Sequence, residues 1–272
     1  MNQSLAISLI QSHLHWEDKE ANLRMFEEKI VGMVERTEVV FLPEMFSTGF
    51  SMNPSLLAET MDGETVNWMK RISAKRKIIL AGSLIIQEND QFYNRLIWTL
   101  PNGRLGIYDK RHRFAYAGED QHYTSGHKRL ISSVNGWKFN MQICYDLRFP
   151  VWARQQLTAG APEFDVLVYV ANWPDKRILA WKTLLQARAI ENQCYVVGVN
   201  RVGKDGNDIS YNGNSMVVNP MGEILYNKEN DEDVFTITLS RERLEETRQR
   251  FPFWKDADRF LIMDDDGMPT MD

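Results

Sequence analysis

Short apolar runs alternate with helix-like segments along almost the whole chain, and this alternation restricts its fold more than any other feature. Residues 5–10 and 195–199 are short, apolar and partly β-branched, as buried strands are. In 18–35 and 64–75, apolar residues recur three and four positions apart, which predicts two helices with one buried face each. A chain that repeats this alternation folds into sheets covered by helices.

The same patterns define the remaining elements. Asn102-Gly103 predicts a hairpin turn between strands at 92–100 and 105–108. Residues 111–128 are polar, aromatic and without periodicity, which indicates a long functional loop. Further strands are expected at 38–42, 78–86, 137–143, 166–170, 216–218, 222–226 and 234–239, and further helices at 151–158, 177–191 and from residue 241. Hairpins combined with βαβ crossovers favour two sheets packed face to face with helices outside, which is a four-layer α-β-β-α sandwich of the α/β class.

Composition and charge argue against several functions for this chain of 272 residues. The 32 basic and 37 acidic side chains give a net charge of −5, which disfavours a nucleic-acid partner. The longest apolar run, 78–86, is too short to cross a membrane, and the N-terminal residues lack the features of a signal peptide. Two cysteines are too few for a disulfide scaffold. Because no linker or repeat divides the sequence, we expect a single domain over residues 1–272. The signal-peptide and cysteine observations together lead us to expect a cytoplasmic location.

Three reactive side chains fall where predicted strands run out into loops: Glu44, Lys110 and Cys144. Strand ends are rigid and face a rim, so side chains there keep a fixed geometry and still meet a ligand. The Cys144 thiol is a weak nucleophile until a base takes its proton, and Glu44, desolvated after an apolar strand, is a suitable base. Lys110 and the backbone N–H of Tyr145 are suited to stabilise the oxyanion that forms when a carbonyl is attacked. The prediction is acyl transfer through a thioester, followed by hydrolysis.

Taken singly, each of these residues has a simpler interpretation. A glutamate after a proline is usually a solvated loop residue, and a lysine beside Asp109 and Arg111 is usually surface charge. An isolated cysteine after an apolar strand is most often a small buried hydrophobe. Cys194 fits that last interpretation, because it opens an apolar strand with no suitable neighbour, and we assign it to the core.

Several segments, in order, resemble the motifs of the nitrilase (carbon–nitrogen hydrolase) superfamily, and the resemblance covers nearly the whole chain. Three carry the reactive residues: FLPEMFSTGF at 41–50, YDKRH at 108–112 and QICYDLRFP at 142–150. Others are RAIENQ at 188–193, VNRVG at 199–203 and NSMVVNPMGE at 214–223. The bacterial omega-amidase branch is the most similar, also through VANWP at 170–174 and FPFWKDAD at 251–258.

The resemblance implies that Glu44 is the general base, Lys110 stabilises the intermediate and Cys144 is the nucleophile. It also implies a second glutamate between the lysine and the cysteine. Glu119 fits that place in a Glu-…-Tyr-x-x-Gly context, with its neighbour Asp120 as the alternative. The family fold is the four-layer sandwich predicted above, its members are usually homodimers or larger assemblies, and the reaction needs no cofactor or metal.

Omega-amidases, as the resemblance implies, hydrolyse the terminal amide of short 2-oxo dicarboxylic monoamides such as 2-oxoglutaramate and 2-oxosuccinamate. The far carboxylate of such a substrate needs a cation or hydrogen-bond donors. Candidates are Arg148, Arg113 and Tyr116, while Phe46 and Trp173 are candidates for apolar walls. For Arg148 the favoured alternative is a structural pair with Asp146 or a helix start. Arg113 stands where the family commonly has an apolar residue, which leaves the loop beside the pocket open to change.

Other functions remain open at this point. Another nitrilase-superfamily amidase, a carbamoylase or a nitrilase would share the same acyl-transfer residues and differ in pocket shape. A metal hydrolase would have to use the five histidines, which are His13, His15, His112, His122 and His127. None of them forms His-Glu-x-x-His, and only His122 and His127 share a loop. A non-catalytic binding protein would have no need of Glu44, Lys110 and Cys144 together.

Overall fold

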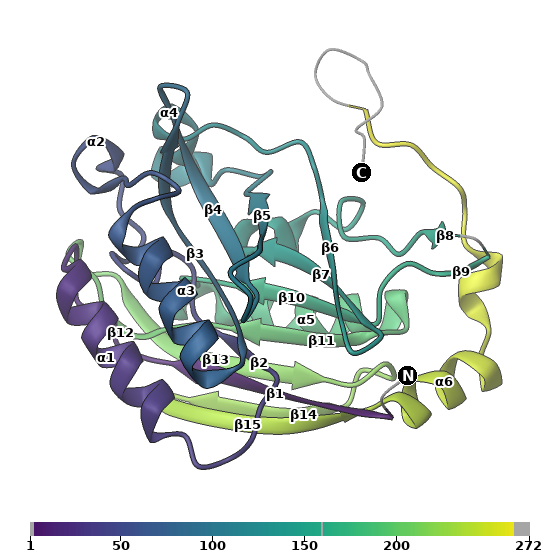
Figure 1. Cartoon of the computed structure of the whole chain (residues 1–272). Helices are drawn as coiled ribbons and strands as arrows, with labels where there is room; N and C mark the ends of the chain where they lie inside the picture. The colour runs from purple at the N-terminus through teal and green to yellow at the C-terminus, as the bar shows by residue number, and fades with distance from the viewer. Residues whose placement is uncertain (1–2, 159, 264–272) are drawn as a thin grey trace.

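The computed structural model describes residues 3–158 and 160–263, and two β-sheets dominate it (Figure 1). The strands of the first sheet are β1 (Ser4–Gln11), β2 (Val39–Phe41), β3 (Ile79–Glu88), β4 (Gln91–Thr99), β5 (Leu105–Asp109) and β15 (Asp233–Ser240). Their order is β15-β1-β2-β3-β4-β5. The strands of the second sheet are β6 (Leu130–Val134), β7 (Trp137–Ile143), β10 (Val166–Val170), β11 (Tyr195–Val199), β12 (Val202–Lys204), β13 (Ser210–Val218) and β14 (Ile224–Glu229). Their order is β12-β13-β11-β10-β7-β6, and β14 pairs with β13.

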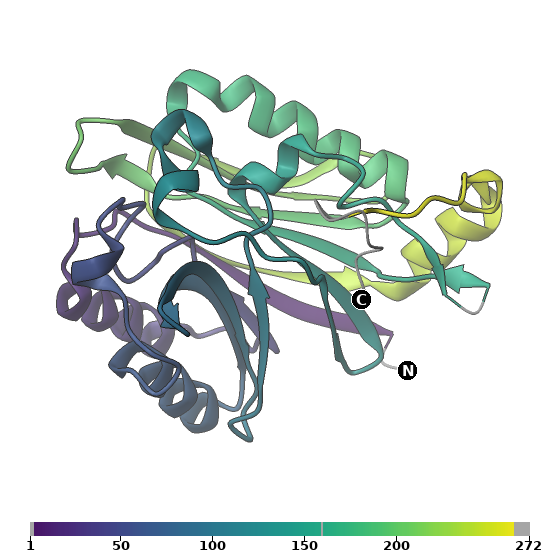
Figure 2. The same cartoon turned by 90° about the horizontal axis from the view of Figure 1, so that it is seen from above.

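Helices connect and flank the strands of the two sheets. They are α1 (Lys19–Gly32), α2 (Pro54–Leu57), α3 (Glu64–Arg76), α4 (Glu119–His122), α5 (Ile178–Asn192) and α6 (Arg241–Arg250), with short 3-10 turns η1 (Ala115–Ala117), η2 (Cys144–Arg148), η3 (Asp175–Arg177) and η4 (Phe253–Asp256). Seen from above, α5 lies on the outer side of the second sheet, and α1 and α3 lie on the opposite side of the molecule (Figure 2). The predicted four-layer α-β-β-α sandwich is confirmed.

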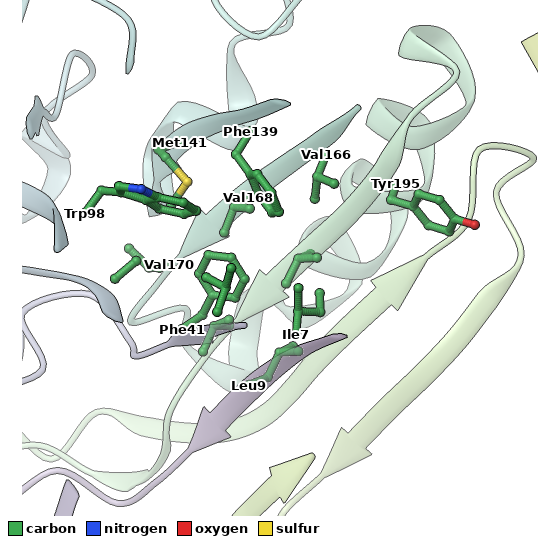
Figure 3. Close-up of a cluster of buried hydrophobic side chains, with 14 of the residues drawn as sticks. Ile7, Leu9, Phe41, Trp98, Phe139, Met141, Val166, Val168, Val170 and Tyr195 are labelled. Atoms are coloured by element: carbon green, nitrogen blue, oxygen red, sulfur yellow. The ribbon is translucent and has the colours of Figure 1, made fainter. Parts of the chain in front are cut away.

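The main apolar core lies between the sheets (Figure 3). Strand β10 shows how the sequence builds it, because side chains alternate between the faces of a strand. Val166, Val168 and Val170 point to the inter-sheet core, whereas Leu167 and Tyr169 belong to the cluster beneath α5. Both faces are therefore buried, which explains why this strand contains no charged residue.

Helix α1 follows from local chemistry as well as from its apolar face. Asp18 precedes it, and the Asp18 carboxylate accepts a hydrogen bond from the Ala21 backbone N–H. That bond satisfies one of the amides that lack a partner in the first turn of any helix. The helix then buries Leu23, Phe26 and Ile30, which lie at the spacing that the sequence predicts.

The helix predicted at 151–158 is wrong. The structure has a turn there, followed by the short strand β8 (Leu157–Thr158), which pairs with β9 (Ala161–Pro162). The side chain of Gln155 bonds to the backbone N–H and C=O of Phe164, and the Gln155 N–H donates to the Asn192 side chain. The Gln155 N–H, which a helix would pair locally, is therefore satisfied by a long-range bond, and the Gln155 side chain ties this segment to Phe164.

Three strand ends meet at one place in the fold. Strand β2 runs parallel to β1 and β3, and β7, β10 and β11 are parallel in the second sheet. Glu44 lies just beyond the carboxyl end of β2, Cys144 follows β7, and Lys110 follows β5. Carboxyl ends of parallel strands are where open α/β sheets bind ligands. Within the described residues, no helix is long and apolar enough to cross a membrane.

Candidate active site

Glu44 is fully buried and every oxygen of its carboxylate is matched. Oε1 accepts hydrogen bonds from Lys110 Nζ and Asn94 Nδ2, both at 2.8 Å. Oε2 accepts from the Asn172 backbone N–H at 2.9 Å. The Asn172 side chain also donates to the Glu44 carbonyl oxygen at 2.6 Å. Asn172, which follows β10 of the second sheet, therefore fixes Glu44, which follows β2 of the first sheet. This carboxylate is therefore fixed in place before any substrate binds.

Lys110 and Glu119 form a buried ion pair beside Glu44. The ammonium of Lys110 lies 2.8 Å from Glu44 Oε1 and 2.9 Å from Glu119 Oε2, and all three side chains are at most 1% exposed. Burial opposes the charge of Lys110, but Glu119 and then Glu44 outweigh it and raise the pKa of the ammonium above its ordinary value. Burial, and then the charge of Glu44, raise the pKa of Glu119, although Lys110 opposes that change.

Cys144 opens η2 directly after β7, and its backbone has a positive φ of 42°. A non-glycine residue in this left-handed region is uncommon and is found where a side chain must be aimed at a site. Its Sγ lies 3.9 Å from the Asn172 carbonyl oxygen, and the side chain is partly exposed. Burial, and then the negative charge of Glu44, raise the pKa of the Cys144 thiol well above its ordinary value. The resting thiol therefore holds its proton until a base takes it.

Asp146 ties the cysteine turn to the lysine loop. Its fully buried carboxylate accepts hydrogen bonds from the Ile143 N–H, from the Tyr108 hydroxyl and from both the backbone N–H and Nδ1 of His112. Ile143 immediately precedes the cysteine, and His112 lies just after Lys110. The two loops are thus held in register by one carboxylate behind the site.

The loop that carries Glu119 is anchored by its own backbone. Gly126 lies so close to Asp109 that a Cβ there would come within 2.0 Å of the Asp109 carbonyl oxygen. The guanidinium of Arg113 donates to the carbonyl oxygens of Asp120 and Tyr123 at 3.3 and 3.0 Å. Glu119 is buried beside Lys110 whereas Asp120 is exposed, so Glu119 and not its neighbour reaches the site.

A pocket opens over the thiol. Its wall combines aromatic side chains with two guanidinium groups, and its lining residues are Phe50, Met52, Phe114, Ala117, Cys144, Tyr145, Arg148, Asn172, Trp173, Pro174, Arg177, Asp205, Asn207, Ile209 and Tyr211. The pocket is contiguous with the Glu44 cluster through Cys144 and Asn172. A small substrate bound here would meet the thiol of Cys144 and the guanidinium groups of Arg148 and Arg177 in one pocket.

The structure brings some of the predicted substrate-binding residues to this pocket and not others. Arg148 and Trp173 line it, and the guanidinium of Arg148 lies 5.0 Å from the centre of the Trp173 ring. The proposed pairing of Arg148 with Asp146 is wrong, because Asp146 bonds elsewhere. Phe46 lies in the core beneath α1 and α3, against Phe26 and Trp68.

The other two candidates lie outside the pocket lining. Arg113 serves the loop backbone, and Tyr116 is 88% exposed. Cys194 is fully buried in the cluster beneath α5, as predicted. The two histidines of the loop, His122 and His127, are both exposed. Across residues 3–158 and 160–263, no three His, Cys, Asp or Glu side chains are grouped to hold a metal ion.

Sequence reasoning missed three residues of the site. Asn94 lies within β4 and donates to both Glu44 and Glu119, at 2.8 and 3.2 Å. Asn172 holds Glu44 from the second sheet. Arg177, at the end of η3, lines the pocket. The available signal for Asn94 was a polar pair, Asn94 and Arg95, between the apolar residues of β4, whereas Asn172 lies inside the motif at 170–174.

Comparisons with known proteins agree with this geometry. The sequence model of the family described as carbon–nitrogen hydrolase matches residues 6–249. The omega-amidase YafV of Escherichia coli K12 is 43% identical over 95% of this chain and 98% of its own length. The 2-oxoglutaramate amidase of Bacillus subtilis is 31% identical over 94% of this chain and 98% of its own. A CN-hydrolase superfamily protein of Xanthomonas campestris, crystallised with an arsenic adduct in its active site, is 41% identical and superposes with a TM-score of 0.94 over 96% of this chain and all of the other.

Proposed function

The chain belongs to the carbon–nitrogen hydrolase family, and we propose that it is an omega-amidase that hydrolyses the terminal amide of short 2-oxo dicarboxylic monoamides. The products are the 2-oxo acid and ammonia. One observation carries the proposal beyond the family: the thiol of Cys144 and the guanidinium of Arg148 line one pocket. An amide carbon at the sulfur and a carboxylate at the guanidinium is the layout that such a substrate requires.

In the proposed reaction Cys144 is the nucleophile and Glu44 is the base. Because the thiol pKa is raised, attack and proton transfer occur together: Sγ bonds to the amide carbon while Glu44 accepts the thiol proton. Glu44 then passes this proton to the amide nitrogen, the C–N bond breaks and ammonia leaves. Water attacks the thioester with Glu44 again as base, the C–S bond breaks, and the thiol recovers its proton.

Lys110 and Tyr145 stabilise the oxyanion in this scheme. An ammonium has three N–H donors, and Lys110 Nζ lies within hydrogen-bond distance of Glu44 Oε1 and of both oxygens of Glu119. A substrate oxygen would take the place of one of the two Glu119 contacts, and the other would keep the ion pair. Tyr145 is the second residue of η2, and the first N–H groups of such a turn have no acceptor within it. Glu119 keeps Lys110 charged and in place, so we assign it as a positioning residue.

The deciding experiment measures ammonia release from 2-oxoglutaramate and 2-oxosuccinamate by the wild type, Cys144→Ala and Cys194→Ala, each with and without a chelator. Cys194 is the matched control, because it is a fully buried cysteine just before the amino end of β11, whereas the charged cluster lies at the carboxyl ends of the strands. We expect chelator-resistant release that Cys144→Ala abolishes and Cys194→Ala preserves. Release that survives Cys144→Ala would overturn the mechanism. If neither substrate releases ammonia but other small amides or carbamoyl compounds are hydrolysed, the omega-amidase assignment would be replaced by another activity of the family.

We also propose that the protein is a cytoplasmic homodimer. Leu179 and Ile190 on α5 are 78% and 55% exposed, and exposed apolar side chains on one helix support contact with a second copy. Both cysteines are free thiols, which suits a reducing compartment. Light scattering that gives the mass of a monomer would contradict the first part, and fractionation that finds the protein outside the cytoplasm would contradict the second.

A further inference from the structure

Two guanidinium groups share the pocket above Cys144, although the proposed carboxylate of the substrate needs only one. Arg148 lies 5.0 Å from the centre of the Trp173 ring, and Arg177 lies 5.1 Å from the centre of the Phe114 ring. Both side chains are half-buried. Among the described residues, no carboxylate lies within salt-bridge distance of either guanidinium. Both residues line the pocket, so their N–H groups are available to a bound ligand.

Arginines that are buried elsewhere in this fold are matched by acceptors. Arg95 binds the carboxylates of Asp109 and Glu88 at 2.6 and 3.0 Å. Arg201 gives its Nε and one terminal nitrogen to backbone carbonyl oxygens. Removal of a guanidinium from water without acceptors is unfavourable. An aromatic ring lies beside all four guanidinium groups, since Arg95 lies over Tyr93 and Arg201 over Tyr211. The two pocket arginines differ in that, among the described residues, neither guanidinium has an acceptor of its own.

The pocket also contains a carboxylate, that of Asp205, but its oxygens are already occupied. Oδ2 accepts from the Tyr211 hydroxyl at 2.8 Å, and Oδ1 accepts from the backbone N–H groups of Asn207 and Ile209. These three bonds hold the turn between β12 and β13. Asp205 is therefore held by the Tyr211 hydroxyl and by the backbone, and the two guanidinium groups outnumber this one carboxylate in the pocket lining.

We propose that Arg177 is a specificity-determining residue that selects a 2-oxo group on the substrate and disfavours a 2-ammonium group; this rests on the proposed function. One guanidinium binds one carboxylate in a two-pronged fashion. A second guanidinium in the same pocket has donors left for another acceptor, and the oxygen at C2 of a 2-oxo acid is such an acceptor. A 2-ammonium group in the same place would bring a positive charge against Arg177, so glutamine would be rejected where 2-oxoglutaramate is accepted.

The test compares three amides that differ only at C2: 2-oxoglutaramate, glutaramate with a methylene there, and L-glutamine with an ammonium. We expect Arg177→Gln to lower kcat/KM for 2-oxoglutaramate about 10- to 100-fold, the loss of one hydrogen bond to a charged donor. For glutaramate the change should be less than about threefold, because that substrate has no oxygen at C2. The ratio of 2-oxoglutaramate to glutamine turnover should therefore fall about tenfold or more.

Two further variants separate recognition from packing. Arg177→Lys keeps the positive charge, so it should still reject glutamine while it loses part of the rate on 2-oxoglutaramate. Arg148→Gln, which removes the proposed carboxylate partner, should lower kcat/KM for 2-oxoglutaramate and glutaramate equally. Lys176→Gln, at the exposed neighbouring position, is the matched control and should change neither.

The outcomes distinguish this inference from the proposal on which it rests. A wild type that prefers 2-oxoglutaramate, together with an Arg177→Gln variant that loses equally on all three amides, would overturn the role of Arg177 and leave the omega-amidase proposal standing. A wild type that releases no ammonia from 2-oxoglutaramate but cleaves glutaramate would overturn the proposed function itself. A selective loss on 2-oxoglutaramate, with an unchanged melting temperature, supports the inference.

Discussion

Two regions of this protein are equally buried and opposite in character: the apolar core between the sheets and the charged cluster at the strand ends. Phe139, in the core, and Glu44, in the cluster, are both 0% exposed. Phe139 packs its ring 5.3 Å from that of Trp98 on the facing sheet, and burial of that kind stabilises the fold by roughly 1.5–3 kcal/mol per large side chain. Glu44, Lys110 and Glu119 instead place two negative charges and one positive charge out of contact with water.

The difference teaches which region serves stability and which serves chemistry. Removal of charges from water costs free energy that their mutual attraction recovers only in part, and buried ion pairs are often neutral or unfavourable for stability. A fold has no energetic reason to gather them unless the reaction needs them. Substitutions in the core should therefore reduce stability and preserve turnover by the folded protein. Substitutions in the cluster should reduce turnover and largely preserve stability.

The largest expected effect is that of Glu44→Gln on turnover. The amide has the same shape but cannot accept a proton, so kcat/KM should fall about 10²–10⁴-fold. Stability should change by no more than about 1–2 kcal/mol, because the amide oxygen can still accept from Lys110 and Asn94, Lys110 keeps Glu119 as its charged partner, and the bond from the Asn172 N–H must rearrange. Steady-state assays and chemical denaturation measure the two quantities on one preparation. A variant that unfolds easily but turns over normally when folded would reverse the comparison.

The next effect belongs to the core. Phe139→Ala should lower the free energy of unfolding by about 3–5 kcal/mol, since it leaves a cavity between Trp98 and Phe41. Turnover per folded molecule, measured well below the melting temperature, should stay within about threefold of the wild type. Phe139→Leu is the control for size and should lose less stability. A large loss of kcat in the folded Phe139→Ala variant would mean that the core also positions Cys144 at the carboxyl end of β7.

The sequence pattern predicts the core better than the charged cluster, and the reason is physical. Strands buried on both faces, such as β10, need apolar residues at every position, so they can be recognised without knowledge of their neighbours. The strand ends with Glu44, Lys110 and Cys144 could be located in the same way. That these three residues act together as a catalytic group could not be predicted from each residue alone, and the resemblance to the family motifs was needed for it.

What escaped prediction depends on contacts between distant segments. Phe46 follows Glu44 by two residues and still turns into the core beneath α1, because backbone direction in a loop is set by tertiary bonds such as that from the Met45 N–H to Ser83. The helix expected at 151–158 was lost to side-chain bonds from Gln155. Arg177 sits beside the pocket only because η3 returns over Phe114.

A smaller effect concerns the pH dependence of stability within the cluster. The pKa of Glu119 is raised in the folded protein, so the folded state holds that proton more tightly than the unfolded state does. This contribution to stability is fully present below the ordinary value near 4.5 and is lost as pH rises through the higher folded pKa. Glu119→Gln does not titrate, so the variant should gain stability relative to the wild type as pH rises above 4.5.

Thermal melts between pH 4 and 8 measure that difference, and Asp120→Asn at the exposed neighbouring position is the control. A stability difference between Glu119→Gln and the wild type that stays constant across this range would show that burial does not disfavour the Glu119 charge. Activity gives a second readout, because Lys110 would lose its stronger partner and turnover should fall although stability does not.

The smallest effect is expected at Arg113, a charged residue that lies beside the cluster without belonging to it. Its bonds reach only the carbonyl oxygens of Asp120 and Tyr123, which other donors or water can satisfy. Arg113→Leu, which restores an apolar residue of the kind common in the family, should change stability by less than about 1 kcal/mol and kcat/KM by a few-fold at most. Denaturation and the 2-oxoglutaramate assay measure both. A loss as large as that of Glu44→Gln would extend the catalytic region into the loop and remove the sharp boundary between charges that act on substrate and charges that hold backbone.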